Sequence, residues 1–418
     1  MSLAARRSAV ALVDQAILSG TSFLTTVAIG RLAGEAELGV YAVGVSVALI
    51  VLAIQDSLIL IPYTFFRERG ERARAYAGSV FVQHALLAWV AGSALAIIGV
   101  VLVVLGRGAT AAVAGALAVV VAGALVHEFA RRTAFIHHRV GGALALDAAS
   151  VVIQVGALVA LALAGRLSAV TALLALGGAR GLAGAARLLL VRASFDVSAS
   201  DWRQTGRRHW GFARYDLTAQ VVGAVEGYAT YWILTLVRDS AETGILAAAM
   251  TVAMVANPIL YGLHNVFVPR IADAQQRGSE EIWRIARQAA FLYVAVMGAF
   301  CAVMIAFGGT ILARLYGPGF EGTGVVVAML AILAVVGATE LAAANGLRAF
   351  GRPDAHLAAG TAGLALVVVV GPPLCARWGV QGAAVTALAA GVLEAVVDWI
   401  WLGRLRRRVA PPQPAPSP

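Results

Sequence analysis

Nine ionisable side chains fall inside long apolar stretches of the sequence. They are Asp14, Asp56, Asp147, Arg180, Asp216, Glu226, Glu340, Glu394 and Asp398. A charge is costly within a lipid bilayer, so such residues usually face the interior of a helix bundle or a water-filled cavity, where they mark ion or substrate pathways. Carboxylates there can bind a coupling proton or a sodium ion, whereas an arginine can hold phosphate oxygens through its planar guanidinium.

Four of these acids are predicted to be ion-coupling residues: Asp14, Asp56, Asp216 and Glu226. Asp14 and Asp216 occupy equivalent places in two similar halves of the chain, which favours a shared role. For Asp147, Glu394 and Asp398 the simpler expectation is that they pair with one another or lie near helix ends.

Arg180 stands in the segment GGARGLAG, whose glycines would let a ligand or another helix approach closely. We predict that it contacts a phosphate group, unless its helix is shifted so far that Arg180 lies at the membrane surface.

The other polar residues do not form an enzyme site. All 32 basic residues are Arg, so the chain has no lysine for a phosphate-binding loop or for Schiff-base chemistry. His127 and Glu128 begin a zinc-protease pattern, but position 131 is Arg. A metal site that includes His137 and His138 is a weakly supported alternative. We therefore predict no catalytic residue, no metal and no cofactor beyond a coupling proton or sodium ion.

Membrane-spanning helices must hold these residues in place. Hydrophobic residues make up 60% of the 418-residue chain and charged residues only 13%, against roughly 25% in soluble domains. A helix needs about 20 apolar residues to cross a bilayer. The windows of that kind are 8–30, 38–61, 76–105, 109–127, 143–164, 168–190, 212–237, 243–267, 289–315, 323–345, 356–376 and 379–402. The sequence therefore predicts an all-α polytopic membrane protein of about twelve transmembrane helices.

The arginines alternate between the two sides of these windows. With a cytoplasmic N-terminus, each predicted outer connection holds a single Arg, whereas the inner segments hold clusters such as those at 67–74 and 404–408. Positively charged connections stay in the cytoplasm. This pattern predicts a multi-pass protein of the bacterial inner (cell) membrane with both termini cytoplasmic. The net charge of +10 then reflects contact with anionic lipid, not nucleic acid.

The chain contains two similar halves. AELGVYA (36–42) follows the first window, and AETGILA (241–247) follows the seventh. Two six-helix halves around a central site are an architecture found in transporters. The predicted domains are an N-terminal six-helix lobe (1–195), a cytoplasmic linker (196–211), a C-terminal six-helix lobe (212–408) and a disordered Pro-rich tail (409–418).

Five short motifs are spread over both halves. In Gly20 to Ala42, Arg31 lies near the end of the first span, and Glu37, Gly39 and Tyr41 open the second. The others are FVPRIADA (267–274), ILARLYGPGFEGTG (311–324), NGLRAFGRPDA (345–355) and WGVQGAAVTALAAG (378–391). In this order and spacing they resemble the polysaccharide-type (O-antigen or lipid-linked oligosaccharide) flippases of the multidrug/oligosaccharidyl-lipid/polysaccharide exporter superfamily.

The resemblance implies two pseudo-symmetric six-helix lobes around a central cavity, and a transporter rather than an enzyme. It implies flipping of a polyprenyl-pyrophosphate-linked oligosaccharide from the cytoplasmic to the outer leaflet by alternating access, for polysaccharide or lipopolysaccharide biosynthesis. Substrate-binding residues would be Arg31, Arg180, Arg270 and Asn345. The implied partners are membrane lipid, the lipid-linked glycan and polysaccharide-assembly proteins. One departure is that the first two spans contain only Arg31, whereas mucopeptide-lipid flippases of this superfamily carry several arginines there.

Three other functions also fit the sequence. A cation-coupled multidrug-type antiporter would have the same fold but an aromatic-lined cavity, and aromatic residues make up only 7% of this chain. A membrane glycosyltransferase or polymerase would need a catalytic carboxylate beside a large outer loop, and the predicted outer loops are short. A third alternative is a membrane protein without activity of its own that helps to assemble a polysaccharide-export complex.

Overall fold

The computed structural model describes residues 3–66, 71–137 and 139–408, and gives the backbone alone for residues 3–16, 71, 140 and 408. The predicted tail at 409–418 lies outside the described residues. The chain divides into two compact units, Met1–Ala224 and Val225–Pro418, and the division falls inside one long helix. Each unit is therefore described by itself.

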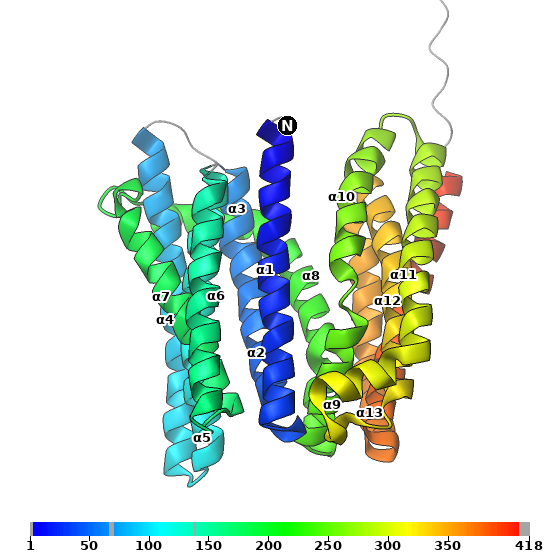
Figure 1. The fold of residues 1–418 in the computed structure, drawn as a ribbon. Coiled ribbons are helices and arrows are strands. Elements are labelled where there is room, and N and C mark those ends of the chain that lie inside the picture. Colours follow the sequence, from blue (N-terminus) through cyan, green and yellow to red (C-terminus); the bar gives the residue numbers. More distant parts are fainter. Residues whose placement is uncertain (1–2, 67–70, 138, 409–418) are drawn as a thin grey trace, which may run out of the picture. The chain divides into compact units, whose positions relative to one another are not determined.

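The first unit holds the helices coloured blue to green in Figure 1. In chain order they are α1 (Leu3–Leu32), α2 (Glu35–Gln55), the π-helix η1 (Asp56–Leu60), α3 (Ile61–Phe65), α4 (Glu71–Val104), α5 (Gly108–Ile136), α6 (Val140–Leu163), α7 (Ala169–Leu190), the 3-10 turn η2 (Arg192–Ser194) and the first part of α8 (Trp202–Val237).

The second unit begins within α8. Its further elements are α9 (Ser240–Ala253), α10 (Asn257–Ala274), α11 (Ser279–Tyr316), the 3-10 turn η3 (Pro318–Phe320), α12 (Gly324–Ala349) and α13 (Pro353–Arg408). The last of these is two helices in sequence, because Gly379 interrupts it with φ 54° and ψ −132°. Only glycine suits that backbone here, since the Glu242 carboxylate occupies the space that a Cβ would need.

The predicted fold class is confirmed. The described residues form helices and no strand. They make up twelve long helical stretches when α2, η1 and α3 are taken as one, α9 and α10 as one, and α13 as two. Eight helices in the described part are long and apolar enough to cross a membrane, or nine if α9 and α10 form one bent span. The three further stretches are α1, α8 and the additional helix obtained when α13 is counted as two.

The second span is broken in both units. In the first, α2 passes into the π-helix η1 at Asp56, and α3 follows with Pro62 in its first turn. In the second, α9 and α10 meet at a bend of 50°, and Pro258 lies in the first turn of α10. Proline is accommodated in a first turn because the backbone N–H there has no helical partner, and single π-turns often mark functional positions.

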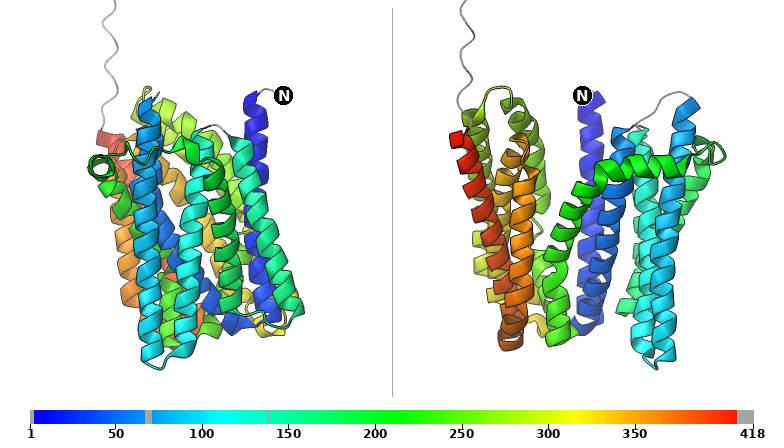
Figure 2. Two further views of the ribbon diagram at one scale, coloured as in Figure 1. Left: turned by 90° about the vertical axis from the view of Figure 1, so that its left-hand side faces the viewer. Right: turned by 180° about the vertical axis from the view of Figure 1, so that it is seen from behind.

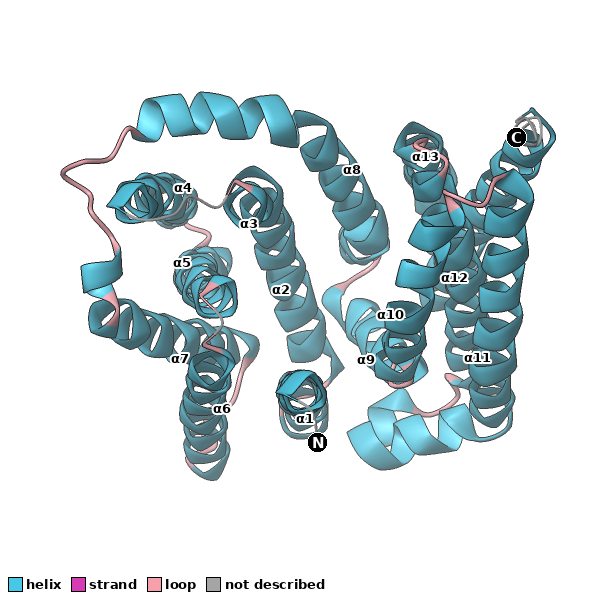
Figure 3. Ribbon diagram, turned by 90° about the horizontal axis from the view of Figure 1, so that it is seen from above, coloured by secondary structure: helices cyan, strands magenta, loops and turns pink. Residues whose placement is uncertain are grey.

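The first part of α8 falls within the predicted linker 196–211. Its residues 202–211 are helical and run crosswise beside α4 before the helix turns (Figures 2 and 3). Gln83 Nε2 donates to the Trp202 carbonyl at 3.1 Å, and the Tyr76 hydroxyl is hydrogen-bonded to His209 Nε2 at 2.9 Å. These bonds hold the polar, Trp-containing segment against α4 as a surface helix.

Close packing of α5 on α7 forms the core of the first unit. A Cβ at Gly177 would lie 2.6 Å from the Cα of Val120, and one at Gly184 would lie 2.9 Å from the Cα of His127. Small residues at a helix interface allow backbones to approach closely, and van der Waals contact then holds helices together in lipid. This contact positions the charged side chains of α5 described below.

Candidate functional site

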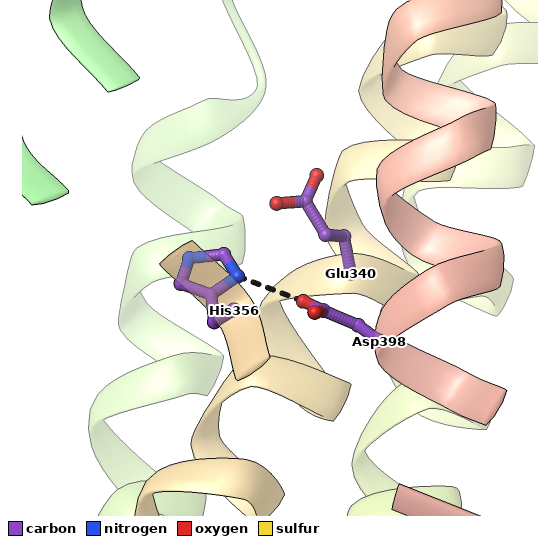
Figure 4. A group of neighbouring side chains, drawn as sticks. All are labelled: Glu340, His356 and Asp398. Carbon is purple, nitrogen blue, oxygen red and sulfur yellow. Dashed lines mark hydrogen bonds and ion pairs between the residues drawn. The ribbon is translucent and has the colours of Figure 1, made fainter. Parts of the chain in front are cut away.

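Four carboxylates and a histidine gather inside the second unit. They come from α8 (Glu226), α12 (Glu340) and α13 (His356, Glu394 and Asp398), and are called the carboxylate cluster below. Figure 4 shows Glu340, His356 and Asp398 pointing toward one another.

The centre of the cluster is compact. His356 Nδ1 lies 2.8 Å from Asp398 Oδ2, and the nearest ligand atoms of Glu340, His356 and Asp398 all lie within 4.8 Å of one another. Glu340 and Glu394 lie close enough to interact electrostatically, and Glu226 lies within electrostatic range of both. Five ionisable groups thus share one small volume.

Two members of the cluster are buried. Asp398 is 0% exposed and Glu394 8% exposed. One oxygen of each, Asp398 Oδ1 and Glu394 Oε1, is buried without a hydrogen-bond partner among the described residues. A buried polar atom without a partner is costly, so these two oxygens are available to a proton or to a bound cation.

Helix geometry explains how these side chains meet. Glu394 and Asp398 are four residues apart on α13 and therefore lie on one face of that helix. The first part of α13 contributes His356, and Gly363 lies two turns further on. Because Gly363 has no side chain, the Glu394 carboxylate occupies the space that a Cβ would fill there.

The charge balance of the cluster sets its chemistry. Within the described part of the chain, no arginine forms an ion pair with its carboxylates, and His356 is the one basic partner. Like charges this close cannot all stay ionised without a compensating cation. Carboxylate oxygens and an imidazole nitrogen can hold protons or a metal cation, so the cluster suits reversible binding of a cation.

The first unit holds a network of a different kind, in which acids are matched by arginines. Arg132 donates to Asp56 Oδ1 at 2.6 Å, and Arg131 donates to Asp147 Oδ2 at 2.9 Å. Glu128, one turn before both arginines, lies within 4.0 Å of each. Asp147 is thus paired with Arg131, which was not among the partners expected for it.

The structure brings two predicted ion-coupling residues together in the first unit. Asp56 opens the π-helix η1 and lies within electrostatic range of Asp216 on α8. Asp216 Oδ2 is buried without a hydrogen-bond partner among the described residues. The side chain of Asp14 lies outside the described residues. The fourth predicted residue, Glu226, belongs to the carboxylate cluster of the second unit.

The predicted substrate-binding residues are distributed over both units. Arg31 ends α1 and is exposed. Arg180 lies within α7, in electrostatic range of Tyr41, Glu128 and Asp147.

In the second unit, the guanidinium of Arg270 on α10 stands 5.4 Å from the centre of the Phe267 ring. Asn345 on α12 is buried, is hydrogen-bonded to His264 Nδ1 at 3.2 Å, and accepts from Arg348 at 3.1 Å. Asn345 thus makes contacts within its own unit.

Sequence reasoning did not group Glu340, His356, Glu394 and Asp398. Two signals were present: the i,i+4 spacing of Glu394 and Asp398, and the acid placed inside the apolar window of α12. Neither signal indicates which helices are neighbours. The structure shows that α12 and the two parts of α13 bring these residues together.

Gly363→Ala should disturb the cluster directly. The new methyl group would displace the Glu394 carboxylate, and overpacking of this kind costs about 1–3 kcal/mol. We expect a lower thermal-unfolding midpoint and a weaker response of that midpoint to replacing choline chloride by NaCl or to lowering the pH. Gly337→Ala is the matched control, because a Cβ there meets open space one turn before Glu340 on α12. An unchanged cation and pH response in Gly363→Ala would contradict the described position of Glu394.

Comparisons with known proteins bear on the fold. No family model matches the chain, and no curated protein matches it. Among solved structures, it is similar to an inward-facing multidrug resistance MATE family transporter of the MOP superfamily, with a TM-score of 0.68 at 13% identity over 98% of this chain and 96% of that one. It is also similar to the lipid II flippase MurJ in an inward closed conformation, with a TM-score of 0.73 at 11% identity over 95% and 87%. A third is the MATE multidrug transporter DinF-BH in complex with R6G, with a TM-score of 0.69 at 12% identity over 95% and 94%. Across nearly its whole length, the chain therefore has the fold seen in these solved transporter structures.

Proposed function

We propose that this protein is a membrane transporter that works by alternating access and is driven by a cation bound at the carboxylate cluster. The observation that carries the proposal is the cluster itself: four carboxylates that have no arginine partner among the described residues, held between helices of a fold that known transporters share. A cation moving through the membrane potential gains about 2.3 kcal/mol per charge per 100 mV. That free energy can drive a change between two conformations.

The proposed substrate is a polyprenyl-pyrophosphate-linked oligosaccharide, moved from the cytoplasmic to the outer leaflet of the inner membrane for polysaccharide biosynthesis. Support comes from the motifs at Arg31 and 345–355 and from the similarity in fold to a protein described as a lipid II flippase. In this proposal both termini are cytoplasmic, and Arg180, Arg31 and Arg270 receive the pyrophosphate. Glycan-assembly proteins would supply the substrate.

A second candidate is a cation-coupled multidrug antiporter. The observation in its favour is that two of the three similar structures above are described as multidrug transporters. Its substrate would be a small organic cation, which needs carboxylates and aromatic rings rather than arginines.

Reconstitution in liposomes separates the two candidates. The purified protein would be given a fluorescent polyprenyl-pyrophosphate glycan or a fluorescent organic cation, under an imposed sodium or proton gradient. We expect gradient-dependent passage of the glycan lipid between leaflets, and at least tenfold slower passage with Arg180→Gln, because one charged hydrogen-bonded contact is worth about 1.5–3 kcal/mol. Arg166→Gln, an exposed arginine outside the helices, is the matched control. Transport of the organic cation without the glycan lipid would replace the first candidate by the second.

A further inference from the structure

A groove in the first unit lies outside every site described so far. It runs between α4 and the crosswise part of α8, with a volume of about 390 Å³. Its walls include Leu86, Leu87 and Val90 on α4, and Trp202, Arg203 and Trp210 on α8. It is called the α4–α8 groove below; Figure 3 shows the crosswise part of α8 beside α4.

The wall of the groove on α4 is apolar and continues the lipid-facing side of that helix. Leu86 is 45% exposed and Val90 48%, and Trp89 and Ile97 further along α4 are exposed at 69% and 62%. Large apolar side chains are exposed in this way where they contact lipid tails. The groove therefore opens onto the hydrocarbon region rather than onto water.

The other wall carries a charge and two interfacial rings. Trp202 and Trp210 are both exposed, and tryptophan is enriched where headgroups meet hydrocarbon. The guanidinium of Arg203 stands 5.3 Å from the centre of the Trp202 ring, at the polar end of the groove. The hydrogen bond from Gln83 to the Trp202 carbonyl fixes this end against α4.

His209 also lines the groove but adds no charge. It precedes the predicted span 212–237, and burial lowers the pKa of its imidazole to about 4. Its Nε2 is already hydrogen-bonded to Tyr76. Arg203 is therefore the charged residue among those that line the groove.

We propose that the α4–α8 groove binds one anionic phospholipid, with an acyl chain against α4 and the phosphate at Arg203. The groove matches such a lipid at both ends. Its apolar wall suits an acyl chain, and the guanidinium of Arg203 suits the phosphate of the headgroup. Basic pockets between helices on the cytoplasmic side suit anionic headgroups. A bound lipid would fasten the surface part of α8 to α4, just before α8 continues into the second unit.

Native mass spectrometry of the purified full-length protein tests this proposal. The probes are phosphatidylglycerol and phosphatidylcholine, offered at equal concentration in mild detergent. We expect one phosphatidylglycerol to be retained, and about fivefold weaker retention with Arg203→Ala, from the contribution of one basic residue at an anionic surface. Arg192→Ala removes an exposed arginine of η2 that does not line the groove, and should retain the lipid as the unmodified protein does.

A second pair of variants tests whether the lipid occupies the groove itself. Gly206 also lines the groove, and a Cβ there would lie at an ordinary 3.6 Å from Gln83 Nε2. Gly206→Ala should keep the lipid, whereas Gly206→Leu should fill the channel and lose it. Equal retention of the two lipids by the unmodified protein would overturn the proposal. So would an equal loss with Arg192→Ala and Arg203→Ala, which indicates only general attraction between the basic surface and anionic lipid.

Discussion

Asp398→Asn is expected to slow cation-driven transport at least tenfold while the protein stays folded. Asp398 is fully buried, contacts His356 at 2.8 Å and has one oxygen without a partner. An asparagine keeps the shape and can still accept a hydrogen bond from His356, but it removes the negative charge that would attract a cation. Coupling between two ligands is typically 1–3 kcal/mol, or about 5–150-fold, and this coupling is what the variant should lose.

Two measurements on the same variant separate cation binding from substrate binding. The first is transport in liposomes, under an imposed gradient, of whichever substrate the unmodified protein carries. The second is thermal unfolding as a function of NaCl and pH without substrate, because a ligand that binds only the folded state stabilises it by RT ln(1 + [L]/Kd). Asp398→Asn should lose both the gradient dependence and the cation-dependent stabilisation.

Asp354→Asn is the matched control for this prediction. Asp354 lies in the first part of α13, but it is exposed and paired with Arg352 at 2.8 Å. Its neutralisation should leave transport within about twofold, because exposed ion pairs contribute little. If Asp398→Asn transports as fast as Asp354→Asn, the carboxylate cluster is not the coupling site, and Asp56 and Asp216 of the first unit become the next candidates.

Hydropathy predicted the helices well because lipid leaves the backbone few alternatives. Unpaired N–H and C=O groups are so costly in hydrocarbon that an apolar stretch of sufficient length becomes a helix. The windows 143–164 and 168–190 accordingly match α6 (Val140–Leu163) and α7 (Ala169–Leu190) closely. Such agreement needs no knowledge of neighbouring helices.

Helix ends were predicted less well where charges are paired. The window 109–127 was taken to end before the arginines at 131 and 132, yet α5 continues to Ile136. Asp147 and Asp56 neutralise those arginines within the unit, so the helix continues past them. A count of charges along the chain cannot detect this pairing, because the partners come from other helices.

The carboxylate cluster was predicted only in part for the same reason. Glu226 was chosen, whereas Glu394 and Asp398 were expected to pair with each other or to lie near helix ends. Their contacts come instead from Glu340 and His356, and Glu340 lies on a different helix. The i,i+4 spacing predicts that the two acids lie on one face of α13. Which residues contact that face depends on how α12 packs against α13.

Gly177→Ala should destabilise the protein by about 1–3 kcal/mol, a cost typical of overpacking. The new methyl group would lie 2.6 Å from the Cα of Val120 and 2.7 Å from its backbone nitrogen. Backbone atoms of a packed helix cannot rotate away as a side chain can, so α5 and α7 would have to separate. We expect a lower midpoint of thermal unfolding in detergent, measured by intrinsic fluorescence on the purified protein.

The neighbouring residue gives the opposite expectation from the same substitution. A Cβ at Gly178 meets nothing within 4 Å, so Gly178→Ala should raise the unfolding midpoint, because alanine is favoured over glycine inside a helix by about 0.5–1 kcal/mol. Both positions lie in the middle of α7 and receive the same methyl group. The intrinsic helical preference therefore cancels between the two variants, and the difference in their stability reports the α5–α7 contact alone. Equal effects at both positions would mean that α5 and α7 are not packed backbone to backbone at Gly177, and the arginines of α5 would then lack the support that holds them against Asp56 and Asp147.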